Sequence, residues 1–273
     1  MKDNVEFRLP VIDPVRLNDK ELLKKLLSVI DHTSLDGTDN EERISGLCDK
    51  ALKSWQLVPE SGVAAVCVFP VFVGLCKNIL SGTPIKVASV AGAFPSGQSP
   101  LTIRLEEAKY ALDHGADEID MVISRGEFLA GNRDHVFGEV AAFKELCGDK
   151  HLKVILETGE LKSLEQIMEA GKIAIDAGAD FIKTSTGKIA TGATPEAFYS
   201  MCIAIKKHFA ETGKIVGIKP AGGISEIETA IMYHDILVQV LGKTWMTKEL
   251  FRIGASRLTD KLIDQINEKN YKL

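Results

Sequence analysis

The chain has 273 residues, of which 45% are hydrophobic and 26% charged, a composition typical of a globular protein with a large core. Its net charge of −5 argues against the basic surface that holds a nucleic-acid backbone, so no nucleic-acid partner is expected. No linker rich in proline or serine divides the chain, and we expect one domain over residues 1–273.

The chain shows no sign of export or membrane insertion. A signal peptide needs a basic start and an apolar stretch, whereas this N-terminus carries Asp3, Glu6 and Pro10. The longest apolar run, residues 62–76, is too short to span a bilayer and is broken by Pro70. The five cysteines form no C-x-x-C pair and are typical of reduced thiols: Cys48, Cys67, Cys76, Cys147 and Cys202. We expect a cytoplasmic protein with no membrane partner.

The predicted elements begin with an amphipathic helix, and residues 1–27 are expected to form a helical extension. Its apolar face carries Leu22, Leu23, Leu26 and Leu27. Eight β-rich runs follow, at residues 28–33, 63–69, 86–92, 118–123, 152–158, 180–185, 215–221 and 251–255. Helical patterns lie between them. One ends near Gly115, and another is predicted to begin after Ser163 and to end near Gly178.

Eight strand-helix units in one α/β domain can form a closed (β/α)8 TIM barrel or an open doubly wound sheet. No G-x-G-x-x-G follows the first strand, so the usual mark of the open dinucleotide-binding sheet is missing. The barrel is therefore the favoured fold.

An internal repeat links the fourth and sixth strands. Residues 113–121 and 176–184 share the pattern D-x-G-A-D-x-I. Gly-Ala-Asp is also a common connection from helix to strand, which could explain the repeat without any functional meaning. The alignment places Asp120 and Lys183 at equivalent positions, and alternate strands of a barrel fill the same interior layer. We expect this carboxylate and this amine to face each other.

A second lysine, Lys219, ends the seventh strand and should approach Lys183 on the neighbouring strand. Two adjacent ammonium groups repel, and burial acts in the same direction, so at least one of the two should have a lowered pKa. A neutral lysine attacks carbonyls and forms a Schiff base. The alternative for each lysine alone is a salt-bridged or solvent-reaching side chain at a strand end.

Three glycine-bearing loops follow the last three strands and would meet at one mouth of the barrel. They are Thr186-Gly187-Lys188, Ala221-Gly222-Gly223 and Gly254-Ala255-Ser256. Any one of them could be only a turn. Together they favour a phosphorylated substrate, because TIM barrels commonly bind phosphate through such loops and a helix N-terminus.

Three further residues are weaker candidates for the substrate site. Asp31 could hold a substrate hydroxyl or water, with Thr33 nearby, although a cap or turn is an equal alternative. Cys67 could line the pocket but suits the role of a small buried apolar residue better. The six histidines show no metal-binding spacing, so no metal is expected.

With these residues in view, the chain resembles the 2-deoxyribose-5-phosphate aldolases, class I aldolases with a TIM-barrel fold. The matching segments, in the family's order, are DHTSL, VCVFP, VAGAFPSG, EIDMVI, LETGEL, FIKTSTGK, GIKPAGGI and FRIGAS. The resemblance implies that Lys183 forms the Schiff base, Lys219 perturbs it and takes part in proton transfer, and Asp120 acts as acid and base. It also implies reversible cleavage of 2-deoxy-D-ribose 5-phosphate to acetaldehyde and D-glyceraldehyde 3-phosphate, in deoxyribose phosphate catabolism and without a cofactor. The family further implies a homo-oligomer, specifically a dimer.

The same resemblance places the phosphate at Gly187, Lys188, Gly222, Gly223, Gly254 and Ser256. Two departures from the family pattern stand out. Arg257 occupies a position where the family often has a second serine, and it could contact the phosphate or point away. Some members have a tyrosine at the very end of the chain, whereas here Tyr271 is followed by two residues and is left outside the predicted site.

Two other functions remain open on the residues alone. One is an isomerase or epimerase acting on a phosphosugar, with Asp120 as base and no imine. The other is a non-catalytic phosphosugar-binding regulator, although such a protein needs neither lysine to be neutral and no separate output domain is visible.

Overall fold

The computed structural model describes residues 7–59 and 62–268, and in these ranges each of the eight predicted runs forms a parallel strand. The strands are β1 (Ile30–Thr33), β2 (Ala65–Val68), β3 (Lys86–Ala91), β4 (Glu118–Val122), β5 (His151–Ile155), β6 (Phe181–Lys183), β7 (Gly217–Lys219) and β8 (Ile253–Ala255). Residues 1–6 of the predicted extension lie outside the described ranges.

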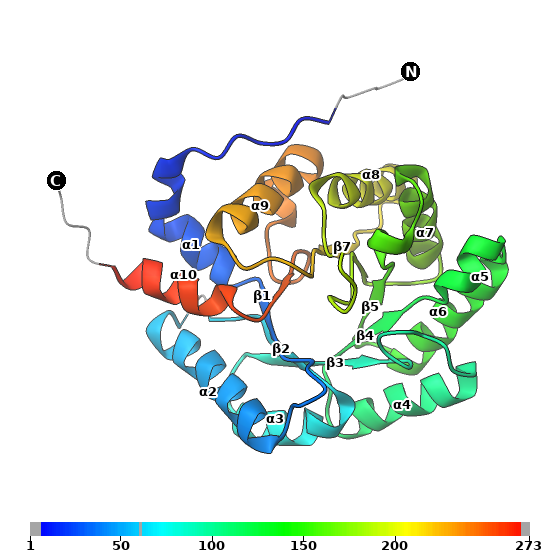
Figure 1. Cartoon of the computed structure of the whole chain (residues 1–273), viewed down its shortest axis with the longest axis horizontal. Helices are drawn as coiled ribbons and strands as arrows, with labels where there is room; N and C mark the ends of the chain where they lie inside the picture. Colours follow the sequence, from blue (N-terminus) through cyan, green and yellow to red (C-terminus); the bar gives the residue numbers. More distant parts are fainter. Residues whose placement is uncertain (1–6, 60–61, 269–273) are drawn as a thin grey trace.

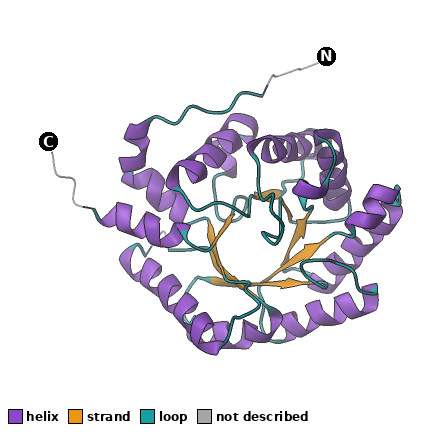
Figure 2. Ribbon diagram, viewed as in Figure 1, coloured by secondary structure: helices purple, strands orange, loops and turns teal. Residues whose placement is uncertain are grey.

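The sheet closes on itself. β1 pairs with both β2 and β8, and each strand from β2 to β6 pairs with the next. β7 meets the last strand through two parallel bridges, Ile218 with Phe251 and Ala221 with Gly254. The orange strands in Figure 2 accordingly form a ring inside the purple helices. The predicted (β/α)8 barrel is confirmed.

An outer layer of helices surrounds the strands (Figure 1). They are α2 (Glu41–Leu57), α3 (Val73–Ile79), α4 (Leu101–Asp113), α5 (Arg125–Ala130), α6 (Arg133–Cys147), α7 (Leu164–Asp176), α8 (Pro195–Thr212), α9 (Ile227–Leu241) and α10 (Leu258–Asn267). Short 3-10 helices occur at Pro14–Asn18, Pro70–Phe72, Thr158–Glu160 and Lys243–Trp245. None of the helices in the described ranges is long and apolar enough to cross a membrane.

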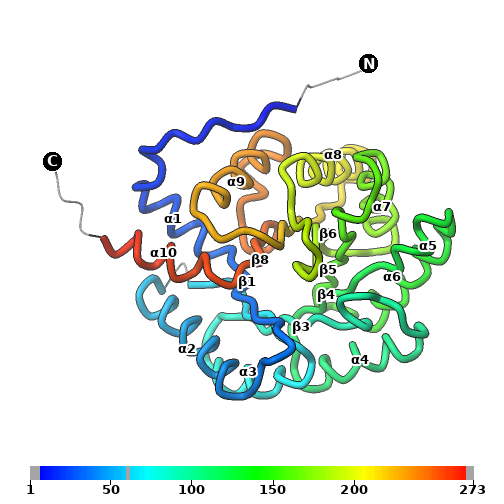
Figure 3. The backbone as a smooth tube through the Cα atoms, in the orientation of Figure 1, coloured from blue at the N-terminus to red at the C-terminus, as the bar shows by residue number. Residues whose placement is uncertain are grey.

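The N-terminal extension is helical over only part of its length. Within the described residues, helix begins at Pro14 and continues as α1 (Lys20–Leu27). The Asp13 carboxylate caps the first turn, and Asp19 caps α1 through the Leu22 amide. The extension runs along α9 in Figure 3. Its Arg16 forms an ion pair with Asp235 of α9. It therefore packs on the outside of the barrel, away from the interior.

The D-x-G-A-D-x-I repeat corresponds to a repeated structural joint. Gly115 and Gly178 each follow a helix with positive φ, +100° and +101°, which glycine adopts without strain. Two residues later, Asp117 accepts the amide of Val87 on β3, and Asp180 accepts the amide of Leu152 on β5. The joint fixes where β4 and β6 begin, and it thereby sets Asp120 and Lys183 at matching heights.

The apolar core lies mainly between strands and helices, and the barrel interior is divided. On β2 and β3, a small apolar cluster contains Ala65, Cys67, Ala88 and Val90, with Leu35 above. The inward residues of the other strands are mostly charged, among them Asp31, Asp120, Lys153, Lys183 and Lys219, all buried. Buried charges are costly unless paired, so this half of the interior calls for a functional explanation.

Candidate active site

The two strand-end lysines and Asp120 meet inside the barrel. Lys183 and Lys219 are register partners on β6 and β7. Oδ2 of Asp120, on β4, lies 2.7 Å from Nζ of Lys183 and 2.8 Å from Nζ of Lys219. The expected approach of this carboxylate to Lys183, drawn from the sequence repeat, is confirmed. One carboxylate oxygen thus accepts hydrogen bonds from both amines.

A wider network of buried ion pairs, which was not predicted from the sequence, surrounds Asp120, Lys183 and Lys219. Lys153 on β5 lies 3.0 Å from Oδ1 of Asp120 and also contacts Glu118. Arg252, just before β8, lies 2.8 Å from Glu118 and 2.7 Å from Asp31. The signal for Lys153 was present, since a lysine inside the apolar run of residues 152–158 is the same anomaly that marked Lys183.

The charges of this network balance without a proton on Lys183. The carboxylates of Asp31, Glu118 and Asp120 match three cations. These cations are Lys153, Lys219 and Arg252, all buried. A charged Lys183 would be a fourth cation without a carboxylate of its own, because it shares the oxygen of Asp120 with Lys219. In a dry interior such an excess charge is strongly disfavoured.

The pKa shifts agree with this charge count. Burial lowers the pKa of Lys183 and the Lys219 ammonium lowers it further, while Asp120 opposes them; the net shift is downward. Burial also lowers the pKa of Lys219, but the carboxylates of Asp120 and Asp31 outweigh it and raise that pKa above the usual value. Of the two strand-end lysines, Lys183 is therefore the one held toward the neutral, nucleophilic form.

The carboxylates of the network make the fold sensitive to acid. Burial alone would raise the pKa of Asp120, but Lys153, Lys183 and Lys219 hold it well below its usual value. Lys153 and Arg252 lower the pKa of Glu118 in the same way.

Because these pKa values are depressed in the folded protein, their stabilisation is present above the unfolded values of 3.8 and 4.5 and is lost as pH falls through the folded values. We expect the free energy of unfolding, measured with urea, to fall by about 2 kcal/mol or more between about pH 5 and about pH 3. A constant value over that range would contradict the ion pairing described above.

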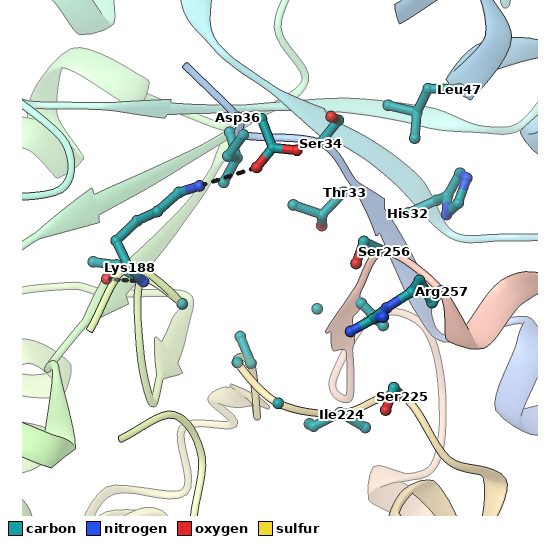
Figure 4. Close-up of a pocket in the computed structure, with 18 of the residues that line it drawn as sticks. His32, Thr33, Ser34, Asp36, Leu47, Lys188, Ile224, Ser225, Ser256 and Arg257 are labelled. Carbon is teal, nitrogen blue, oxygen red and sulfur yellow. Dashed lines mark hydrogen bonds and ion pairs between the residues drawn. The ribbon is translucent and has the colours of Figure 1, made fainter. Parts of the chain in front are cut away.

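Above the lysines, the C-terminal mouth of the barrel holds a cavity of about 780 Å³. Nine of the predicted site residues line it: Thr33, Lys183, Thr186, Gly187, Lys188, Gly222, Gly223, Gly254 and Ser256. All three glycine-bearing loops therefore meet at one cavity, with Lys183 reaching it from the interior. Figure 4 shows the cavity with Thr33 and Ser256 on one wall and Lys188 on another.

The glycines of these loops keep the space open. Gly187, Gly222 and Gly223 have φ values of +75°, +87° and +79°, a region in which other residues are strained. A Cβ on Gly254 would lie 3.2 Å from Cε of Lys219 and 2.9 Å from Cβ of Ala221. Gly254 therefore leaves room for the lysine that shares Asp120 with Lys183.

Four predicted site residues do not line the cavity: Asp31, Cys67, Asp120 and Lys219. Asp31 is fully buried, and its Oδ2 lies 2.5 Å from Nζ of Lys219. It is neither a cap nor a turn residue but part of the ion network, and its predicted contact with a substrate hydroxyl has no support in the cavity lining. Cys67 belongs to the small apolar cluster, and burial raises its pKa, as expected of an unreactive thiol.

Thr186 lines the cavity, but its hydroxyl is already engaged. Its Oγ1 donates to Glu157 and accepts the amide of Lys188 at 3.0 Å. Glu157 is buried two residues after β5, with a positive φ of 54°, and also accepts the Thr186 amide. Arg125 contacts the same carboxylate. Thr186 thus shapes the loop that carries Gly187 and Lys188, a role that the sequence analysis did not separate from direct binding.

Arg257 and Tyr271 are the two residues at which the chain departs from the family pattern, and the structure describes only the first of them. Arg257 lines the cavity at the start of α10, and in Figure 4 its side chain extends between Ser256 and the loop that carries Ile224 and Ser225. Tyr271 lies outside the described residues.

A family model described as "DeoC/LacD family aldolase" matches residues 25–242 of the chain. The deoxyribose-phosphate aldolase of Mus musculus is 43% identical over 256 residues, which cover 89% of this chain and 80% of the mouse protein. The human deoxyribose-phosphate aldolase is 42% identical with the same coverage of both chains. Among solved structures, a tetrameric deoxyribose phosphate aldolase from Aeropyrum pernix aligns with a TM-score of 0.71 and 25% identity, covering 94% of this chain and 99% of that one.

Proposed function

The chain belongs to the DeoC/LacD family of aldolases, and on that basis we propose that it cleaves 2-deoxy-D-ribose 5-phosphate reversibly to acetaldehyde and D-glyceraldehyde 3-phosphate. The observation that carries the mechanism is Lys183, a lysine with a lowered pKa that reaches the cavity from a charge-balanced interior. A neutral amine at this place is what a Schiff-base aldolase requires.

The reaction begins when the amine of Lys183 attacks the aldehyde carbon of the open-chain sugar. The resulting carbinolamine takes up a proton and loses water to give an iminium ion, which draws electrons from the bond between C2 and C3. A base removes the proton of the C3 hydroxyl, the bond between C2 and C3 breaks, and glyceraldehyde 3-phosphate leaves. The remaining enamine takes up a proton at carbon, and hydrolysis releases acetaldehyde and the free amine.

Asp120 and Lys219 serve the amine rather than the sugar directly, because neither lines the cavity. Asp120 accepts a hydrogen bond from Lys183 at 2.7 Å, which orients the amine. Lys219 holds the same carboxylate ionised, and the pair can pass protons to and from the imine nitrogen or through water. The proposed reaction uses no metal and no cofactor.

The substrate phosphate is proposed to bind at the glycine-bearing loops. Gly187, Gly222 and Gly223 line the cavity and would offer backbone amides to it, and Ser256 adds a hydroxyl beside the start of α10. Amides and a helix N-terminus together attract phosphate oxygens. Lys188, which follows Gly187 on the same loop, brings a positive charge to the same mouth.

A direct assay tests this function. The purified protein is incubated with 2-deoxy-D-ribose 5-phosphate, and acetaldehyde is measured by its reduction with an alcohol dehydrogenase and NADH. We expect acetaldehyde and glyceraldehyde 3-phosphate in equal amounts. Tight binding of the sugar phosphate without acetaldehyde would favour the non-catalytic binding protein. Isomerised or epimerised sugar without acetaldehyde would favour the alternative enzyme with Asp120 as base.

We also infer a cytoplasmic homo-oligomer. The five cysteines are buried and free, which suits a reducing compartment. The A. pernix relative is described as tetrameric, while a dimer is the prediction for this chain. Light scattering on the purified protein distinguishes monomer, dimer and tetramer.

A further inference from the structure

We propose that Arg257 is a specificity-determining residue that binds the substrate phosphate. The proposal rests on the function proposed above and concerns a position where the sequence pattern left two possibilities open. Arg257 follows the Gly254-Ala255-Ser256 loop, immediately before α10, and lines the same cavity as Lys183.

The other cations at the mouth already have carboxylate partners. Nζ of Lys50 lies 2.7 Å from Asp260. Arg43 lies 3.1 Å from Asp36 and also contacts Asp39. Lys188, the predicted phosphate lysine, lies 3.6 Å from the same Asp36. In Figure 4 its side chain turns toward Asp36.

Arg257 differs from these residues. Within the part of the chain that the structure describes, its guanidinium forms no ion pair and no hydrogen bond. Lys261 and, to a smaller extent, the charge of Arg257 lower the pKa of Glu226, but the Glu226 carboxylate forms its ion pair with Lys261, at 2.5 Å. Arg257 is therefore a cation of the cavity whose hydrogen-bonding groups are all available to a ligand.

The surroundings of Arg257 suit an anion with several oxygens. Gly187, Gly222 and Gly223 line the cavity, and their backbone amides donate to no acceptor in the described residues. Figure 4 shows the Arg257 side chain between Ser256 and the loop of Ile224 and Ser225, which directly follows two of these glycines. A phosphate dianion held by these amides would meet the guanidinium on one side.

Arginine is well suited to this task. Its planar guanidinium can donate two parallel hydrogen bonds to two phosphate oxygens, and such charge-assisted bonds are stronger than neutral ones. Because Lys188 shares its charge with Asp36, most of the neutralisation of the dianion falls to Arg257. The residue should therefore decide how strongly the site prefers phosphorylated over unphosphorylated sugar.

The test compares kcat and KM for 2-deoxyribose 5-phosphate and for unphosphorylated 2-deoxyribose in wild type, Arg257→Ser and Arg257→Lys. For Arg257→Ser we expect KM for the phosphorylated sugar to rise about 10- to 100-fold, with kcat changed much less. The unphosphorylated sugar should be turned over as by wild type. For Arg257→Lys we expect a KM between those of wild type and Arg257→Ser, because lysine keeps the positive charge but cannot donate two parallel hydrogen bonds to the phosphate. Lys50→Ser removes one positive charge from the same cavity and should change KM less than about 3-fold.

Equal losses on both sugars would overturn the proposal, and so would an unchanged KM for the phosphorylated sugar in Arg257→Ser. If wild type releases no acetaldehyde at all, the proposed function is wrong, and Arg257 is then tested by calorimetric titration with inorganic phosphate. A weaker affinity in Arg257→Ser than in Lys50→Ser would still support phosphate binding by Arg257. Equal affinities would refute it.

Discussion

We expect the Lys183→Met protein to lose acetaldehyde release by about 10⁴-fold or more, because the other lysines that line the cavity, Lys50 and Lys188, are ion-paired with Asp260 and Asp36 and cannot replace the nucleophile. Lys153 and Lys219 lie nearby, but their pKa values are raised by carboxylates, so they stay protonated near neutral pH. The measurement is kcat for cleavage of 2-deoxyribose 5-phosphate. Substantial turnover by this variant would favour the isomerase or epimerase reaction, which needs no imine.

Folding must be separated from chemistry in this variant. Because the network balances without a charge on Lys183, methionine should leave the free energy of unfolding unchanged or slightly higher. The Lys183→Arg variant tests the same charge count in the opposite direction, because it places a permanent fourth cation in the barrel interior. It should be equally inactive and clearly less stable. If the two variants were equally stable, the charge count of the interior would be wrong.

The Asp120→Asn protein is expected to lose both rate and stability. Asp120 takes part in three ion pairs, with Lys153, Lys183 and Lys219. Without the carboxylate, two buried ammonium groups lose a partner, which costs about 3–5 kcal/mol of folding free energy. Loss of the proton-transfer partner should lower kcat by a further 10²- to 10⁴-fold, roughly the range of general acid–base catalysis. Urea unfolding and steady-state kinetics measure the two effects separately.

A pH profile distinguishes loss of the acid/base group from partial unfolding. The Asp120 carboxylate raises the pKa of Lys183, so its removal lowers that pKa further. The amine is active only when unprotonated, and the acid limb of kcat/KM should therefore move to lower pH in Asp120→Asn. A limb that stays in place or moves to higher pH would contradict this electrostatic assignment.

The main architecture could be read from the sequence because its signals are local. Each strand is a short β-rich run, and Ser163 caps α7 through the amide of Gln166 as predicted. The facing of Asp120 and Lys183 was also predictable, because a repeated joint with Gly115 and Gly178 gives both strands the same starting point.

The ion network below the lysines could not be predicted in the same way. Arg252 and Glu118 are far apart in the chain, and their pairing depends on how the barrel closes between β7 and β8. The ion pairing of Asp31 depends on the same closure, because its partners are Lys219 on β7 and Arg252 just before β8. Likewise, the engagement of Thr186 by Glu157 depends on a turn that the sequence pattern does not specify.

The most direct test of the central claim is to trap the imine. The protein is incubated near neutral pH with acetaldehyde and sodium borohydride, digested, and mapped by mass spectrometry. We expect one ethyl group on Lys183, within residues 181–188, and none on Lys153 or Lys219. An adduct on Lys219, or no adduct on any of the three buried lysines, would contradict it.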